Sequence, residues 1–265
     1  MKFAAFVLAA AGIVAAAPGT KLIQRDYSPL TPRASRSRYN SAPLKRLSTE
    51  AVENLEKTHG IRNVEYSSNW GGAVKIGNGY NHVTGTITVP EASGFDGAAA
   101  SAWVGIDGDT CQTAILQTGI SVYADGTFDA WYEWIPDYSY SFSGFSVHVG
   151  DQIKMTVDAS SKTKGVATLQ NLSTGKTVTH TFTNTPSSLC ETNAEWIVEA
   201  FEEDGSQVTL ADFGTVTFTN AVASGSSGST TPAGADILDI SPDNGRSIQA
   251  AASVSGSTVT VKYVG

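Results

Sequence analysis

From residue 63 to the C-terminus, the chain is a succession of short segments in which side chains alternate with the two-residue period of β-strands. In 129–135 the odd positions share one face, and Tyr132 and Trp134 share the other. Glycine is frequent (26 residues) and charged residues make up only 16% of the chain, a composition typical of all-β proteins with many turns. We therefore expect an all-β fold in which residues 63–265 form one sandwich of two antiparallel sheets.

The expected elements follow from the turn residues between them. Only 48–59 has a good helical pattern, with Ser48 or Thr49 as N-cap and Gly60 just past its end. The stretch 223–235, rich in Ser, Thr and Gly, is expected to be a surface loop. Strands are expected near 68–76, 82–89, 100–107, 112–118, 128–135, 145–148, 151–158, 165–170, 177–183, 195–202, 207–210, 213–219, 247–253 and 257–263.

The first 17 residues have the features of a secretory signal peptide. Lys2 precedes an apolar run that ends in three alanines, and this run is too short to span a membrane. We assign 1–17 to a signal peptide, and we expect a secreted, extracellular protein that does not associate with membranes.

The next segment, 18–62, differs from the remainder in charge. It holds nine Lys/Arg and four Asp/Glu (net +5), whereas 63–265 holds seven Lys/Arg and 21 Asp/Glu (net −14). This contrast predicts a basic propeptide held partly by charge, with Lys45-Arg46 as a processing site. A disordered basic tail is the alternative. The strongly acidic remainder disfavours nucleic-acid binding, because it would repel phosphate.

Secretion affects the interpretation of the cysteines and of one sequence motif. In an oxidising compartment Cys111 and Cys190 are expected to form a disulfide, with two free buried thiols as the alternative. Asn171-Leu-Ser173 is an N-glycosylation motif, and we expect Asn171 to lie on a surface turn beside Thr174-Gly175.

The chemistry must come from carboxylates and amides, because the sequence lacks a zinc-peptidase HExxH motif, a serine nucleophile elbow and an aspartic-peptidase Asp-Thr/Ser-Gly pair. Glu199 falls between Val198 and Ala200 on an otherwise apolar strand, where a carboxylate is costly unless it is bonded or faces a wet cleft. Gln117 ends an apolar run in the same way. A structural salt bridge and a hydrogen-bonded core amide are the respective alternatives. Asp107 and Asp109 lack the later ligands of a calcium loop, so a turn is favoured there.

Four motifs together resemble one family. They are 68–72 (SNWGG), 103–119 (WVGIDGDTCQTAILQTG), 129–134 (DAWYEW) and 193–199 (NAEWIVE). They closely resemble the eqolisins, the secreted acid glutamic peptidases of filamentous fungi, in order and with natural spacing from about residue 64 onward.

The resemblance implies a lectin/glucanase-like β-sandwich made as a preproprotein, with a Gln/Glu dyad formed by Gln117 and Glu199. It implies that Glu199 is the general base and acid and that Gln117 stabilises the oxyanion. Cys111 and Cys190 match the family's disulfide. Where better-known members commonly carry an acidic residue, this chain has Ser121. The cleft residues implied by the motifs are Trp70, Trp103, Asp107, Asp129, Trp131 and Glu133.

The expected partners are protein or peptide substrates, with the propeptide as an intramolecular inhibitor. We expect a monomer that uses no cofactor and no metal. Two other functions remain open from the residues alone. Asp129 and Glu133 flank Trp131 on one strand face, an arrangement that also fits a glycoside hydrolase or a carbohydrate-binding lectin.

Overall fold

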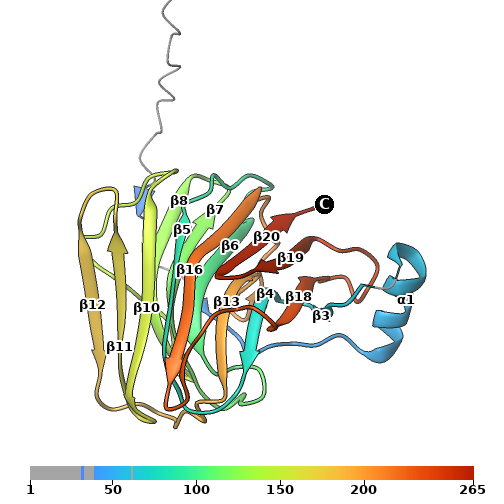
Figure 1. Ribbon diagram of the computed structural model, residues 1–265. Helices are drawn as coiled ribbons and strands as arrows, with labels where there is room; N and C mark the ends of the chain where they lie inside the picture. The colour runs from blue at the N-terminus through green and yellow to red at the C-terminus, as the bar shows by residue number, and fades with distance from the viewer. Residues whose placement is uncertain (1–30, 33–38, 61) are drawn as a thin grey trace, which may run out of the picture.

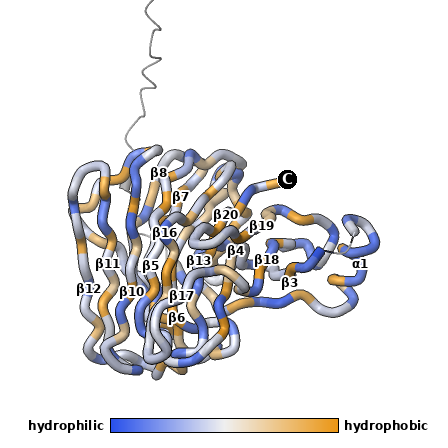
Figure 2. Tube along the Cα trace, in the orientation of Figure 1, coloured by the Kyte–Doolittle hydropathy of each residue, from blue (hydrophilic) through white to orange (hydrophobic). Residues whose placement is uncertain are grey.

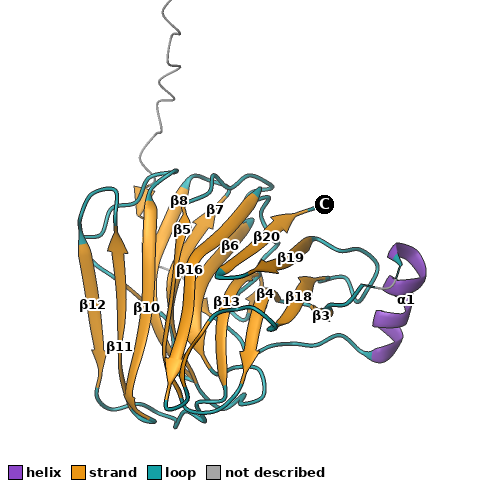
Figure 3. Ribbon diagram, viewed as in Figure 1, coloured by secondary structure: helices purple, strands orange, loops and turns teal. Residues whose placement is uncertain are grey.

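The computed structural model describes residues 31–32, 39–60 and 62–265 (Figure 1). The predicted signal peptide and the first part of the predicted propeptide lie outside these residues. The regular secondary structure of the described chain is almost entirely β-strand, with one helix (Figure 3), so the all-β prediction is confirmed. No helix in these residues is long and apolar enough to cross a membrane.

The strands form two layers that share one strand. The layer that we call the short sheet has the order β12-β11-β10-β5-β16-β17, and all its pairings are antiparallel. Its strands are β5 (Tyr80–Thr88), β10 (Gln152–Ser161), β11 (Lys164–Asn171), β12 (Thr177–Phe182), β16 (Thr215–Gly225) and β17 (Gly228–Thr230).

The other layer, the long sheet, runs in the order β9-β8-β7-β6-β13-β4-β18-β19-β20. Two further short strands, β1 and β3, pair in parallel with β8 and β18. The strands are β1 (Thr31–Pro32), β3 (Glu65–Ser67), β4 (Trp70–Ile76), β6 (Ala99–Ile106), β7 (Ile115–Tyr123), β8 (Thr127–Ile135), β9 (Tyr140–Ser141), β13 (Asn193–Glu199), β18 (Asp236–Ile240), β19 (Ala250–Ser255) and β20 (Thr258–Tyr263).

Strand β16 connects the two sheets. Its residues 215–218 pair with β20 of the long sheet, and from Thr219 onward it pairs with β5 of the short sheet, with a register shift between Thr219 and Val222. Asn220, within the shift, has a positive φ of 51°. Such an irregularity increases the twist of a strand and lets it leave one sheet for the other.

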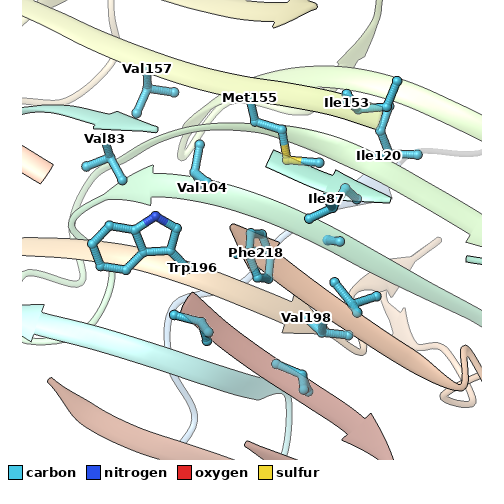
Figure 4. Packing of buried hydrophobic residues seen from close by; sticks show 14 of the residues in the cluster. Val83, Ile87, Val104, Ile120, Ile153, Met155, Val157, Trp196, Val198 and Phe218 are labelled. Atoms are coloured by element: carbon cyan, nitrogen blue, oxygen red, sulfur yellow. The ribbon is translucent and has the colours of Figure 1, made fainter. Parts of the chain in front are cut away.

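The main core lies between the two sheets (Figure 4). Residues of the long sheet such as Val104, Trp196 and Val198 face Val83 and Met155 of the short sheet, all with essentially no exposure. The Trp196 indole N–H reaches across the layers to the Thr84 carbonyl at 2.8 Å. Apolar residues recur along the strands of both layers (Figure 2). Because this apolar set takes alternate positions of β6, β7 and β13, their other face is available for a site.

Three segments fold differently from the sequence prediction. The expected strand near 145–148 is wrong, because only a bridge residue interrupts irregular chain there. The expected strand near 207–210 is only partly present, because β15 ends at Gln207 and Leu210 forms an isolated bridge with Ala99. The expected loop at 223–235 is also wrong, because β16 continues to Gly225 and forms a hairpin with β17. The prediction failed because Ser, Thr and Gly give no alternation of apolar and polar residues in this stretch. Two strands can nevertheless pair through their backbone hydrogen bonds without such alternation.

The end of the predicted propeptide packs on the long sheet. The predicted helix is confirmed as α1 (Thr49–His59), with the Ser48 hydroxyl as N-cap acceptor and Gly60 at its C-cap. Ahead of it, β2 (Tyr39–Asn40) pairs with β14 (Glu202–Glu203), which also pairs with β15 (Ser206–Gln207). Helix α1 lies beyond β3 and β18, at the opposite end of the molecule from β12 (Figure 1).

Candidate active site

The face of the long sheet that points away from the main core carries most of the predicted site residues. Cross-strand pairing places Gln117 of β7 between Gly105 of β6 and Glu133 of β8. On the neighbouring strand β13, Glu199 lies between Trp70 of β4 and Ser101 of β6. Directly paired residues share a face, and so do residues two apart, so Gln117 and Glu199 project from the same side of the sheet.

Gln117 and Glu133 form a buried pair. Both are 0% exposed, and Gln117 Nε2 donates to Glu133 Oε2 at 2.8 Å. Burial raises the pKa of Glu133 well above its ordinary value, and the nearby Glu199 raises it further. Glu133 is therefore neutral in acid, and its carbonyl oxygen still accepts the amide N–H.

Glu199 is held by two tryptophans and by the leader, our term for residues 39–47. Trp103 Nε1 donates to Glu199 Oε2 at 2.9 Å, and Trp103 packs edge-on against Trp70 with ring centroids 4.9 Å apart. The glutamate is completely buried, which raises its pKa to about 7, although the hydrogen bond from the Ala42 N–H opposes this rise. Burial without a counter-ion makes this carboxyl group a good proton acceptor.

The leader passes through the cleft above these residues. The Ser41 N–H donates to Glu133 Oε2 at 3.3 Å and the Ala42 N–H donates to Glu199 Oε1 at 3.0 Å. Trp70 Nε1 donates to the Ala42 carbonyl at 3.0 Å. Two consecutive backbone N–H groups of the leader thus bind the two buried acids.

The remaining cleft side chains line a small polar hollow beside the leader. It is bounded by Asp129, Trp131 and Glu133 of β8, together with Ser101 and Ser121. Trp131 Nε1 donates to the Ser121 hydroxyl at 3.0 Å, which donates to Ser101 at 3.2 Å. At the position where an acidic residue was expected from the resemblance, Ser121 thus orients a tryptophan of the cleft.

Asp107, which was also predicted to lie in the cleft, is not among the residues that line this hollow and binds a neighbouring loop instead. Its two carboxylate oxygens accept backbone N–H groups from Cys190 through Asn193, at 2.7–3.3 Å. The residue has a positive φ of 70° in the turn that follows β6. Its role is to hold the loop next to the disulfide, which is formed between Cys111 and Cys190 as predicted.

Asn171 is also placed differently from the prediction. It lies at a turn with Gly175 as expected, but its side chain is 0% exposed. Asn171 Nδ2 donates to Asp151 Oδ2 at 2.7 Å, and Oδ1 accepts the N–H groups of Ser173 and Thr174. The folded chain therefore does not present this amide nitrogen as a surface acceptor.

Sequence reasoning missed Asn69 as a residue that binds the leader. Asn69 Oδ1 accepts the Lys45 N–H at 2.9 Å, and Nδ2 donates to the carbonyls of Ala42 and Pro43. A side-chain amide next to a buried tryptophan in 68–72 was the available signal. Its significance depends on a leader that lies 24 or more residues earlier in the chain.

A family model described as the peptidase A4 family matches residues 68–263, which include every strand of the cleft. The chain belongs to the peptidase A4 family. This peptidase is 46% identical to aspergillopepsin-2 of Aspergillus niger, over all of both chains, and 44% identical to scytalidopepsin B of Scytalidium lignicola, over 97% of this chain and 96% of the other.

Solved structures agree with this membership. The structure of scytalido-glutamic peptidase with a transition state analog inhibitor is similar with a TM-score of 0.72 and 49% identity, covering 74% of this chain and 98% of that one. The aspergilloglutamic peptidase of Aspergillus niger gives 0.60 and 57%, covering 63% and 99%. The eqolisin resemblance and the β-sandwich are thus confirmed, and the chain is an enzyme of the glutamic peptidase type rather than a glycoside hydrolase or a lectin.

Proposed function

We propose that this peptidase is secreted and acts in acid as an endopeptidase, with Gln117 and Glu199 as its catalytic dyad. The observation that supports this most strongly is their placement. Both are fully buried polar side chains on one face of the long sheet, and each is fixed by its own partner, Glu133 and Trp103. The leader covers both side chains, and its Ala42 N–H binds Glu199 directly.

The reaction uses a water molecule between the two side chains. Glu199, as a carboxylate, takes a proton from this water while the water oxygen attacks the scissile carbonyl carbon. An N–H of Gln117 donates to the carbonyl oxygen as negative charge develops on it. Glu199 then gives its proton to the leaving nitrogen, the C–N bond breaks, and a carboxylic acid and an amine result. An uncharged amide donor is unaffected by acid pH.

Removal of the leader prepares Glu199 for this role. With the leader in place, burial is the main cause that raises the pKa of Glu199 to about 7, so the group is protonated in acid. When the leader departs, Glu199 loses the Ala42 N–H, which lowers its pKa, but water relieves the burial, which is the larger cause, so we expect the pKa to fall towards its ordinary value. A larger fraction of Glu199 is then ionised at acid pH and able to accept a proton.

The leader acts as an intramolecular inhibitor in this proposal. The Ala42 N–H binds Glu199 Oε1, the oxygen that would activate water, and Ser41 binds Glu133 in the same way. Ion pairs fix the segment: Lys45 Nζ lies 2.6 Å from Glu202, and Arg46 pairs with Asp109 and Glu65. We expect acid pH and high salt each to weaken the binding of the leader, and salt does so by screening these ion pairs. A leader equally bound at neutral pH, at low pH and in high salt would contradict this part.

The function is tested by casein hydrolysis at acid pH, in the presence of an inhibitor of aspartic peptidases, after the leader of every protein has been removed by the same added peptidase and both have been separated from the product. We expect hydrolysis to persist with the inhibitor and to fall by about a thousandfold or more in Gln117→Ala and Glu199→Ala. Asp96→Asn, an exposed acid of the 91–97 loop, is the control and should keep its activity. Full activity in either variant would refute the assignment of Gln117 and Glu199 as the catalytic dyad. Inactivity on casein combined with β-glucan hydrolysis would refute the peptidase itself.

A further inference from the structure

The leader lies in the cleft in the way that a bound peptide would. Besides the contacts of Ser41 and Ala42, the Leu44 N–H donates to the Gly108 carbonyl at 3.0 Å, and Gln112 Nε2 donates to the Leu44 carbonyl at 3.0 Å. These bonds use only main-chain atoms of the leader, so any extended peptide could form them. Any preference of the cleft for particular residues must therefore come from contacts with side chains.

Two leader side chains contact distinct sets of residues, which we call the first and the second pocket. Leu44 is only 3% exposed, and its cluster is apolar: Trp70, Val74, Trp103, Ile115, Trp131, Ile135, Ile197 and Leu238. Two residues further on, Arg46 Nη1 lies 2.5 Å from Asp109 Oδ1 and Arg46 Nε lies 2.9 Å from Glu65 Oε2. The first pocket thus selects an aliphatic side chain and the second a planar cation.

The second pocket depends on its cation. The Asp109 side chain is 0% exposed, whereas that of Arg46 is 42% exposed. Asp109 Oδ2 is buried without a hydrogen-bond partner among the described residues. Removing the partner of a buried carboxylate destabilises a protein far more than removing the partner of an exposed carboxylate. Once the leader leaves, Asp109 therefore lacks the guanidinium that matched it, in a cleft where substrates bind.

We propose that the mature enzyme uses these two pockets as substrate subsites, so that it prefers peptides with an aliphatic residue followed, two positions later, by arginine. The inference rests on the proposed peptidase function. Asp109 and Glu65 are the residues that determine specificity for the basic side chain. Arginine is favoured over lysine, because only a guanidinium reaches two carboxylates from one planar group.

The test is to digest a peptide library of mixed sequence with the acid-processed enzyme and to count residues at each position relative to the cuts by mass spectrometry. We expect one position enriched in Leu, Ile or Val, and arginine enriched two residues towards the C-terminus of it. The second measurement uses paired peptides that carry arginine or its neutral isostere citrulline at that position. We expect kcat/KM to favour arginine by about tenfold, since a hydrogen bond to a charged group has this order of effect.

Variants identify the pocket. Asp109→Asn and Glu65→Gln should each reduce the arginine-to-citrulline ratio, and the double variant should bring it close to one, whereas Asp96→Asn should leave it unchanged. If wild-type enzyme cuts both peptides equally well, or if Asp109→Asn leaves the ratio intact, the pocket serves only to hold the leader and the inference is wrong. If wild-type enzyme cuts neither these peptides nor casein, the proposed function itself has failed.

Discussion

The Gln117 amide donates a 2.8 Å hydrogen bond to Glu133 Oε2, and the two residues are direct cross-strand partners on β7 and β8. An amide can rotate about its last torsion angle and present either its oxygen or its nitrogen to a neighbour. The bond to Glu133 fixes which side of the amide group carries the nitrogen. In the proposed mechanism, the second N–H of this nitrogen binds the substrate carbonyl. We therefore infer that Glu133 is a positioning residue for the proposed dyad.

Substitution of Glu133 tests this role. Glu133→Ala should lower kcat about a hundredfold with little change in KM, because the oxyanion donor loses its orientation while the binding surface remains. Glu133→Gln retains an acceptor oxygen and should lose less than about tenfold. Steady-state kinetics on one peptide substrate at acid pH, with circular dichroism as the folding control, measures both. Equal losses in the two variants would contradict the positioning role.

The backbone contact between the leader and Glu199 can be tested with synthetic peptides. A peptide of residues 39–47 should inhibit the mature enzyme in trans. An ester analogue, in which oxygen replaces the Ala42 N–H, should bind about tenfold more weakly, because it removes the hydrogen bond to Glu199. Inhibition constants from competition assays give the comparison, and a scrambled peptide of the same charge is the control. An ester that inhibits as well as the amide would show that this contact contributes nothing.

Stability should depend on pH through Glu195. The side chain is 0% exposed, neither carboxyl oxygen has a hydrogen-bond partner among the described residues, and burial, with Asp107 and Asp109 nearby, raises its pKa well above the ordinary value. A raised pKa means that the folded state holds the proton more tightly than the unfolded chain does. The resulting stability is fully present below the ordinary carboxyl pKa and is lost as pH rises through the folded pKa. Glu133 and Glu199 contribute with the same sign while the leader is bound.

We therefore expect the melting temperature of the full chain to fall between acid and neutral pH, and Glu195→Gln to be the more stable protein at neutral pH by about 5 °C. Thermal unfolding by circular dichroism, with all proteins carrying Glu199→Gln so that the leader stays attached, gives this comparison. The exposed Glu91→Gln is the matched control. Melting curves of wild type and Glu195→Gln that fall in parallel would show that Glu195 is not the responsible group.

The buried Asn171 predicts that the mature protein carries no glycan there. Attachment would require Nδ2 to give up its 2.7 Å bond to Asp151 and would place a sugar inside the fold. The intact mass of the protein, expressed with its predicted signal peptide and purified, should be unchanged by an endoglycosidase and should equal that of the unmodified chain. Ser173→Ala, which removes the motif and leaves Asn171, is the control. A sugar mass lost on digestion in wild type and missing in Ser173→Ala would contradict the prediction.

Some of the site was predictable because local patterns carry it. A glutamine in an apolar run and a glutamate inside an apolar strand are anomalies that any strand placement reveals, and Gln117 and Glu199 were predicted on this basis and by resemblance. Asp107 shares a motif with cleft residues but lies past the end of β6, where the turn points its side chain at the chain after Cys190. Asn171 was expected at the surface because polar turn residues are usually exposed. Its amide is instead buried, and it forms the hydrogen bonds that hold the turn together.

By itself, the sequence determined the fold class, the helix and the disulfide, and it singled out the two residues of the proposed dyad. Strand alternation, capping residues and a pair of cysteines act over short distances or leave a single pairing. Only the tertiary structure decided that the leader, at Ser41 and Ala42, reaches Glu133 and Glu199, which are 92 and 157 residues away in the chain. It also decided that Arg46 neutralises Asp109. Such contacts depend on the register of distant strands, which no local pattern encodes, because burial and pairing are properties of the assembled sheet.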